Sequence, residues 1–438
     1  MRKSCILLFS ALLLLLFWPA GAGGLEEGSK DDSLDAVIEE IALDVSAIRG
    51  IEFDGPVQYG IKTKDELREY LKKLIKEELP GDKLLADQKA LAKFGLIPPD
   101  MHLETFLLEL YTEQVVGFYD WRTKTLYLID DIPENLLRPV ISHELTHALQ
   151  DQYVGIENLP IFREKENDDR IMATQALLEG DANSVMIDYA LKPMGRDSTM
   201  LPNIEPLIEE FTSTMGGRLM TSAPAFIRSN VLFPYINGFT FIQQLRQSGG
   251  WAQVNRLLEH PPQSTEQVLH PEKYFAEADS PTTITLPQLS KELGKGWTLL
   301  GENTLGEFNT SMLLDEFLED APETITSGWD GDLYQVYEHE PSGEVALVWF
   351  TTWDGPGDAQ EFFAGYASVL AKKYGSEGVS GTEQYSLVFT TREDDGTPVT
   401  QAHIALRESD VVVLDGVPRA SIDAVKASAL SKEPGTIR

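Results

Sequence analysis

Apolar residues recur at helical spacing along most of the first 290 residues, and turn residues mark the helix ends. Thr63-Lys64-Asp65-Glu66 forms a capping box that begins a helix running to Leu79, and Pro80-Gly81 ends it. The same signals predict further helices at about 35–48, 82–94, 103–115, 136–152, 171–191, 204–215 and 251–259. Between the last two, Phe233 to Gly238 has the residues of a turn, and Gly249-Gly250 predicts a break.

Two regions carry strand patterns instead. Residues 117–130 alternate as a β-hairpin, directly before the helix at 136–152. Past residue 290, helices are expected at 304–318, 358–373 and 420–430, and Asp394-Asp395-Gly396 has the residues of a hairpin turn. Strands are expected there at 333–337, 345–352, 386–391, 400–406 and 411–414. This order predicts a separate α+β domain with an antiparallel sheet, in which we find no catalytic constellation.

The first 22 residues have the features of a secretory signal peptide. Arg2 and Lys3 precede an apolar run from Cys5 to Trp18, and Ala20-Gly21-Ala22 supplies the small residues of a cleavage site. The alternative is an uncleaved signal anchor, although the run is short for a bilayer span. Cys5 precedes the run, so it does not form a lipobox, and it is the only cysteine. We therefore expect a secreted protein without disulfides and without a stable membrane span after cleavage.

These boundaries divide the rest of the chain into three parts. Residues 23–60 are glycine-rich and acidic at their start, which favours a linker or a propeptide. Residues 61–290 are expected to form one domain and residues 291–438 the C-terminal domain. The net charge of the chain is −34, which disfavours nucleic acid and anionic membranes as partners.

The strongest chemical signal is His143-Glu144-Leu145-Thr146-His147 (HELTH), in the helix expected at 136–152. Two histidines four positions apart project from one face of a helix, so both imidazoles can reach one metal ion. Zinc is the expected ion, and Glu144 is then the candidate general base for a bound water. We expect Asn135 to cap this helix and Pro139 to lie in its first turn. The alternative is an amphipathic helix with both histidines hydrogen-bonded in a core.

A zinc hydrolase needs a third protein ligand. The metzincin continuation is absent, because Gln150 and Tyr153 replace its glycine and third histidine. Glu179 is the favoured ligand, since it lies in an apolar helix where an unpaired carboxylate would be costly. Gly180 beside it is explained if another backbone passes close by. The rival acids are Asp151, Glu164, Glu166, Asp168 and Asp169. The last four belong to a charged run that favours a solvated loop or, alternatively, a calcium site.

HExxH followed by a helix with Glu179-Gly180-Asp181-Ala182 resembles the gluzincins, the thermolysin-like zinc peptidases. The HELTHALQDQ run resembles more narrowly a group of secreted prokaryotic proteins classed as metallopeptidases, most of them uncharacterised. The resemblance spans about 61–275 and is strong only at the two zinc segments. It implies an α+β fold: a mainly helical zincin-like catalytic domain with a small hairpin, followed by the C-terminal domain. Asn183 departs from the pattern, because thermolysin-like enzymes have an aspartate there that orients a zinc histidine.

The resemblance also implies a residue that stabilises the oxyanion and an edge strand that binds peptide. Tyr235 and His270 are the candidates for the oxyanion, with His260 and Tyr274 weaker. The hairpin at 117–130 is the candidate edge, or it simply covers the core. The implied function is a secreted zinc metallopeptidase acting on a peptide or protein substrate. The alternatives are a chaperone-like or surface protein that binds peptide with little turnover, and a zinc amidase acting on a non-protein amide.

Overall fold

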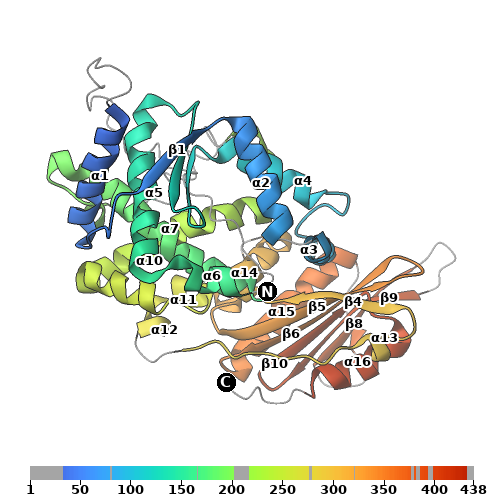
Figure 1. The fold of residues 1–438 in the computed structure, drawn as a ribbon. Coiled ribbons are helices and arrows are strands. Elements are labelled where there is room, and N and C mark those ends of the chain that lie inside the picture. The colour runs from blue at the N-terminus through green and yellow to red at the C-terminus, as the bar shows by residue number, and fades with distance from the viewer. Residues whose placement is uncertain are drawn as a thin grey trace.

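The structure is a computed structural model, and it describes residues 33–78, 81–164, 166–201, 217–275, 279–319, 321–375, 379–380, 385–392 and 398–431. The expected signal peptide at 1–22, the helix at 204–215 and the turn at 394–396 lie outside these residues. The α+β fold class is confirmed: a mainly helical part lies beside a large antiparallel sheet (Figure 1). Within the described residues, no helix is both long and apolar enough to cross a membrane.

Among the described residues, seven helices of twelve residues or more form the body of the helical part. They are α1 (Ser33–Arg49), α2 (Lys64–Glu78), α3 (Gly81–Phe94), α4 (Leu103–Gln114), α5 (Glu134–Val154), α7 (Asp168–Leu191) and α10 (Ala225–Glu259). Shorter ones are α6 (Pro160–Arg163), α9 (Gly217–Ser222), α11 (Thr265–Leu269) and α12 (Pro271–Phe275). The HELTH helix α5 begins earlier than expected, after Pro133, so Asn135 is not its cap and Pro139 lies inside it.

The small sheet has three strands in the order β1-β3-β2. The expected hairpin is present, with β2 (Gly117–Asp120) antiparallel to β3 (Thr125–Ile129). No strand is expected from the residues of β1 (Gln58–Lys62), yet β1 pairs parallel with β3 on its other side. β3, which precedes α5, is therefore the central strand. The expectation that the strand before α5 offers an open edge to a peptide is wrong, because β3 is paired on both sides.

Residues 33–62 belong to the folded helical part, which corrects their assignment to a linker. α1 packs on α5 and α7, where its buried Ile38, Ile41 and Val45 share a core with the α5 residues Ile141 and Leu145. The sequence did not reveal that α1 packs on α5 and α7, because α1 is mostly polar on its other face and follows an acidic, glycine-rich stretch.

α7 and α10 cross with their backbones in contact. A Cβ atom built on Gly180 of α7 would lie 2.2 Å from the Gly238 carbonyl oxygen of α10. A Cβ on Gly238 would lie 2.1 Å from the Ala176 oxygen of α7. The expected close backbone at Gly180 is confirmed, whereas the expected turn at 233–238 is wrong because these residues lie inside α10. The expected break at Gly250 is confirmed by its φ of 63°.

The large sheet has seven strands in the order β4-β5-β6-β10-β9-β8-β7, and every neighbouring pair is antiparallel. The strands are β4 (Trp297–Asn303), β5 (Trp329–His339), β6 (Glu344–Trp353), β7 (Val379–Ser380), β8 (Ser386–Arg392), β9 (Pro398–Arg407) and β10 (Asp410–Asp415). One face packs on α3 and α15 (Pro356–Tyr374), and the other packs on α13 (Ser290–Leu293) and α16 (Ile422–Ala429). α14 (Gly306–Phe317) joins the sheet to the helical part.

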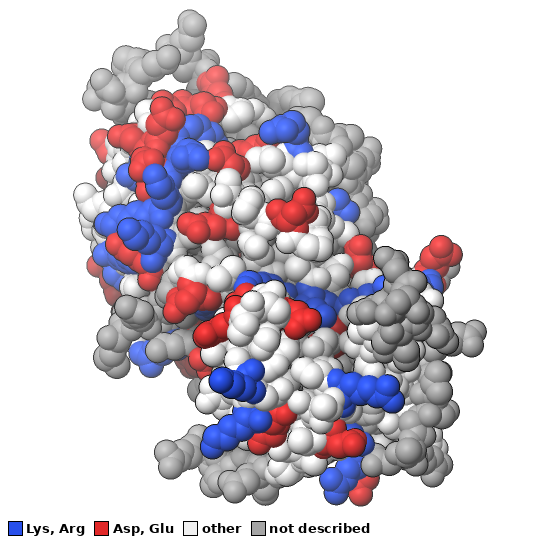
Figure 2. All heavy atoms as spheres, turned by 90° about the vertical axis from the view of Figure 1, so that its right-hand side faces the viewer, with Lys and Arg blue, Asp and Glu red and all other residues white. Residues whose placement is uncertain are grey.

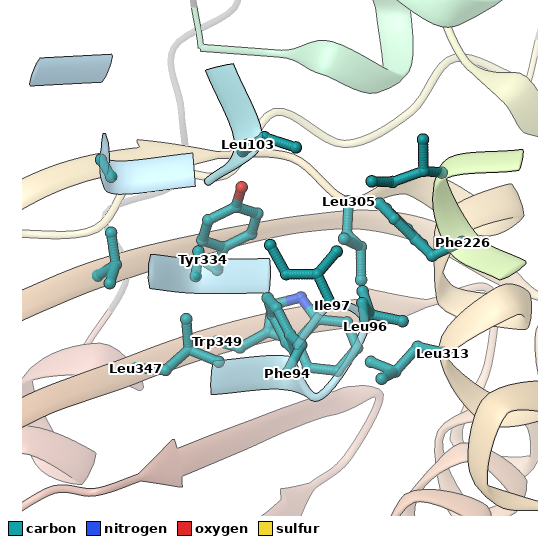
Figure 3. Close-up of a cluster of buried hydrophobic side chains, with 14 of the residues drawn as sticks. Phe94, Leu96, Ile97, Leu103, Phe226, Leu305, Leu313, Tyr334, Leu347 and Trp349 are labelled. Atoms are coloured by element: carbon teal, nitrogen blue, oxygen red, sulfur yellow. The ribbon is translucent and has the colours of Figure 1, made fainter. Parts of the chain in front are cut away.

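The helical part and the large sheet share one hydrophobic core (Figure 3). The ring of Phe94, at the end of α3, packs edge-on against Tyr334 of β5 and Trp349 of β6, with centroids 5.4 and 5.3 Å away. Leu96 and Ile97 add to this core beside Leu305 and Leu313 of the C-terminal part. The pattern of the sequence changes near residue 290, as expected, but the parts of the protein before and after this position pack together in one core.

Candidate metal centre

Two adjacent helices bring three potential metal ligands together. His143 and His147 project from α5, and Glu179 projects from α7, which packs against it. The Nε2 atoms of the two histidines are 3.2 Å apart. Glu179 Oε2 lies 3.2 Å from His143 Nε2 and 3.6 Å from His147 Nε2. All three side chains are buried. The structure thus brings together the three residues that the sequence selected.

The spacing of these donor atoms fits zinc. Ligand atoms about 2.0–2.1 Å from one zinc ion at tetrahedral angles lie roughly 3.3 Å from each other. The three measured separations are between 3.2 and 3.6 Å. Two imidazoles and one carboxylate also leave the fourth position free for water, as in catalytic zinc sites. The residues present therefore fit a catalytic zinc ion better than a closed structural one.

The rival acids have other roles in the structure. Asp151 accepts hydrogen bonds from Tyr119 and Lys124, and Asp169 accepts them from Thr265. Glu164 pairs with Arg170, and Asp168 lies 3.6 Å from Lys83. Glu166 is exposed. None of these five belongs to the group of side chains around His143 and His147.

Gln150 determines which nitrogen of His147 faces the other ligands. Its Nε2 donates to the Leu178 carbonyl oxygen at 3.1 Å and to Asp181 at 3.0 Å, which fixes the orientation of the amide. Its Oε1 then lies 2.8 Å from His147 Nδ1, where it can only accept a hydrogen bond. The proton of neutral His147 therefore sits on Nδ1, and Nε2 offers its lone pair to a metal. Sequence reasoning missed this role, although Gln150 lies one helical turn from His147 on the same face.

Asn183 lies four residues after Glu179, as the aspartate of thermolysin-like enzymes does, and it is close enough to His143 to affect the pKa of that imidazole. From the described residues, no hydrogen bond of good geometry reaches Nδ1 of His143. The two histidines are thus supported differently, because the carboxylate in this network, Asp181, acts on His147 through Gln150.

Glu144 is buried beside the cluster, and its charge helps to raise the pKa of His147. Tyr235 reaches the same place from α10 and lines a cavity together with Glu179. Burial, and then the charges of Glu179 and Glu144, raise the pKa of Tyr235 well above its ordinary value. Its hydroxyl therefore keeps its proton at neutral pH and remains a hydrogen-bond donor.

His270 is not brought to the cluster. Its Nε2 lies 3.0 Å from Glu307 Oε1, and it lines a different cavity with Phe233 and Ile236. The expectation rested on an irregular segment facing the cleft, but His270 caps the short helix α11 and faces α14 instead. The two weaker candidates bind each other, since the Tyr274 hydroxyl donates to the His260 carbonyl oxygen at 2.6 Å.

A cavity of about 210 Å³ extends from Glu179 and Tyr235 into the C-terminal part. Leu103 and Leu107 of α4 line one wall, and Leu305 and Tyr334 line another. Its lining also includes the polar residues Lys83, Asp87, Asp168 and Asn303. A space of this size next to the cluster can hold a side chain of a bound peptide, and both parts of the protein contribute to it.

A second group of acids, Glu266, Asp279 and Asp354, surrounds an amino group and not an open space. Lys273 Nζ lies 2.5 Å from Glu266, 3.0 Å from Asp354 and 3.7 Å from Asp279. The ammonium already supplies the positive charge that these carboxylates need, so this group is a structural ion-pair network.

The charges within the metal centre predict how protons compete with zinc. Burial opposes a charged His147, but the charge of Glu179, its hydrogen bond and the charge of Glu144 raise the pKa of His147 to about 9. Burial opposes a charged Glu179 as well, but the two histidines lower its pKa to about 2. Metal-free protein at pH 7 therefore holds an imidazolium–carboxylate pair, and zinc must displace a proton.

We expect zinc affinity to rise as the pH rises from about 6.5 to about 9, with release of about one proton per zinc bound at pH 7. Acidification should strip the metal. Isothermal titration calorimetry in buffers of different ionisation enthalpy measures the proton count, and metal analysis after dialysis at acidic pH measures the loss. Binding that releases no protons, or zinc retained at acidic pH, would show a different ligand set.

The same pKa values give the opposite trend for the stability of metal-free protein. The raised pKa of His147 means that its pairing with Glu179 stabilises the fold fully below the unfolded value of about 6.5. This contribution is lost as the pH rises through about 9. Thermal unfolding with a chelator should therefore show a midpoint that falls between pH 6.5 and 9, and a His147→Gln control should show a smaller fall.

Comparison with known proteins adds one match. Residues 297–426, most of the C-terminal part, match the family described as "Domain of unknown function (DUF8575)". No curated protein and no solved structure matches the chain. The match covers the large sheet with α14, α15 and part of α16, and it does not include the metal centre.

Proposed function

We propose that this protein is a secreted zinc-dependent metallopeptidase of the gluzincin type. The observation that carries the proposal is the convergence of His143 Nε2, His147 Nε2 and Glu179 Oε2 at separations of 3.2 to 3.6 Å. These three residues would hold the zinc ion. Bound zinc supplies Lewis acidity and a water whose pKa is near 7.

The protein's own groups have distinct roles in this proposal. Glu144 accepts the proton of the attacking water and passes it to the leaving amine. Tyr235, which keeps its proton, donates a hydrogen bond to the oxygen of the tetrahedral intermediate. Gln150 holds His147 with its Nε2 toward the ligand cluster. His270 has no part in the reaction.

The substrate in this proposal is a peptide or an unfolded protein. The cavity beside Glu179 and Tyr235 has mostly apolar walls, which suits one side chain of an extended chain. Acidic and basic side chains are interspersed on the face shown in Figure 2, so this face offers no uniformly basic surface for nucleic acid. The C-terminal part contributes Leu305 and Tyr334 to the cavity, which gives it a place in substrate binding.

The direct test is incubation of the purified protein with a denatured proteome, with and without a chelator, followed by mass spectrometry of the products. New peptide termini that need zinc support the peptidase. Binding of unfolded protein without new termini would favour a chaperone-like protein. Cleavage of a non-protein amide alone would favour the amidase.

Replacing Glu179 with alanine should abolish stoichiometric zinc and peptidase activity together, because two histidines alone hold zinc weakly. Glu166→Ala is the matched control: it removes an exposed acid nearby in sequence and should spare both properties. Metal analysis of the folded proteins measures this. A folded Glu179→Ala protein that keeps one zinc per chain would disprove the assignment.

A further inference from the structure

The last residue of the N-terminal helix is buried next to the metal centre. Arg49 ends α1 and is only 2% exposed. Its Nε lies 2.9 Å from Asp181 Oδ1, and one terminal nitrogen donates to Asp181 Oδ2 at 3.3 Å. This ion pair joins residues that are 132 positions apart in the chain. Burying an arginine costs free energy unless its charge is paired and its N–H groups are hydrogen-bonded.

Residues of α10 hold Arg49 in place. The same terminal nitrogen donates to Asn255 Oδ1 at 2.8 Å. The guanidinium carbon lies over the Trp251 ring, 4.3 Å from its centroid, at the distance of a cation–π contact. These contacts fix the guanidinium, and the guanidinium in turn fixes the carboxylate of Asp181.

Asp181 passes this constraint to the metal ligand. Its Oδ2 accepts the hydrogen bond from Gln150 Nε2 at 3.0 Å, and Gln150 Oε1 accepts from His147 Nδ1 at 2.8 Å. The Gln150 amide makes all three of its hydrogen bonds in one orientation only. Without Arg49, neither the ion pair nor the hydrogen bond from its guanidinium would hold the Asp181 carboxylate in this orientation. A carboxylate that turned away from Gln150 would no longer fix its amide, and a turned amide would present Nε2 to His147 Nδ1, which favours the tautomer with its proton on Nε2.

We propose that Arg49 is a positioning residue of the metal centre, acting through Asp181 and Gln150 to keep the lone pair of His147 on Nε2. Helix α1 therefore helps to set the geometry of the metal centre in addition to packing against it. The zinc-affinity part of this inference rests on the proposed zinc site. The tautomer part concerns metal-free protein and stands separately.

Arg246 provides a control within the same packing. It is also nearly buried, and it stacks on the same Trp251 ring at 3.9 Å from the centroid. It also pairs with an α7 carboxylate, Asp188, at 2.7 Å. Asp188 binds Ser198 and has no bond to Gln150. Loss of Arg246 should thus remove a similar amount of packing and charge pairing without affecting His147.

The experiment uses the full chain as Arg49→Met, Asp181→Asn and Arg246→Met. Asp181→Asn keeps the shape of the side chain and tests the same relay if Arg49→Met fails to fold. Zinc affinity is measured by competition with a chromogenic chelator. The His147 tautomer is measured in metal-free protein by NMR of ¹⁵N-labelled imidazoles at a pH above its pKa.

We expect Arg49→Met and Asp181→Asn to weaken zinc binding about 10–100-fold and to increase the Nε2–H form of His147. Arg246→Met should lower the thermal midpoint while leaving affinity and tautomer unchanged. Equal effects of all three variants on affinity, or an unchanged tautomer in Asp181→Asn, would overturn the inference. A wild-type protein that binds no zinc would refute the proposed function, and the tautomer measurement would still decide the role of Arg49.

Discussion

Replacing Glu144 with glutamine is expected to slow peptide hydrolysis about 10²–10⁴-fold while leaving zinc bound. Glutamine has nearly the shape of glutamate but cannot accept and release a proton at neutral pH. Glu144 is adjacent in sequence to the proposed ligand His143, yet it is not one of the three clustered donors, so zinc should stay in place. Initial rates on an unfolded protein, measured beside zinc content, give the result.

The proposed mechanism requires that Glu144→Gln slows the catalytic step and leaves substrate binding unchanged. We therefore expect kcat to fall with little change in the affinity for a non-cleaved peptide. Glu157→Gln, a change of the same kind just beyond the end of α5, is the control and should keep full activity. Near-normal hydrolysis by Glu144→Gln would mean that another group takes the proton and that the proposed mechanism is incorrect.

The largest effect on stability is expected for Gly180→Ala. The added Cβ would lie 2.2 Å from the Gly238 carbonyl oxygen, and the atom it meets belongs to a helix backbone, which cannot swing aside as a side chain can. α7 and α10 would have to separate, with loss of the packing along their crossing. We expect a loss of about 3 kcal/mol or more in the free energy of unfolding, measured by denaturant titration.

Gly357→Ala is the matched control, because Gly357 is also in a helix, α15, and no atom lies within 4 Å of its added Cβ. Alanine there should be neutral or slightly stabilising. Glu179 is next to Gly180, so the Gly180→Ala protein should also bind zinc more weakly even where it folds. Equal stability of the two glycine variants would show that α7 and α10 do not cross this closely.

The sequence was most informative where the signal is local or repeated. HELTH placed two histidines on one face, and the apolar helix around Glu179 identified the third member of the cluster. Gly180 predicted a close backbone because glycine in a buried helix otherwise only costs stability. The sequence did not identify Gly238 as the residue that Gly180 contacts. Residues 233–238 have the composition of a turn, although they lie inside α10.

The parts that could not be predicted depend on contacts between distant segments. β1 is short and partly exposed, so its residues carry no clear strand pattern until β3 lies beside it. In the sequence, Arg49 resembles an ordinary basic residue at the C-terminal end of a helix, where a positive charge interacts favourably with the helix dipole. Its link to Asp181 exists only because α1 folds back on α7. Tyr235 was selected for a turn that does not form, yet it reaches the cluster from a helix.

The packing of Phe94 against Tyr334 and Trp349 constrains how the C-terminal domain can be exchanged between genes. The stretch that matches a known domain family supplies the sheet and α15 but not α3, which lies about 200 positions earlier and covers part of one sheet face. If recombination moved this stretch alone, it would leave aromatic rings exposed to water. A host protein could accept the domain only if it supplied an apolar helix of its own in place of α3.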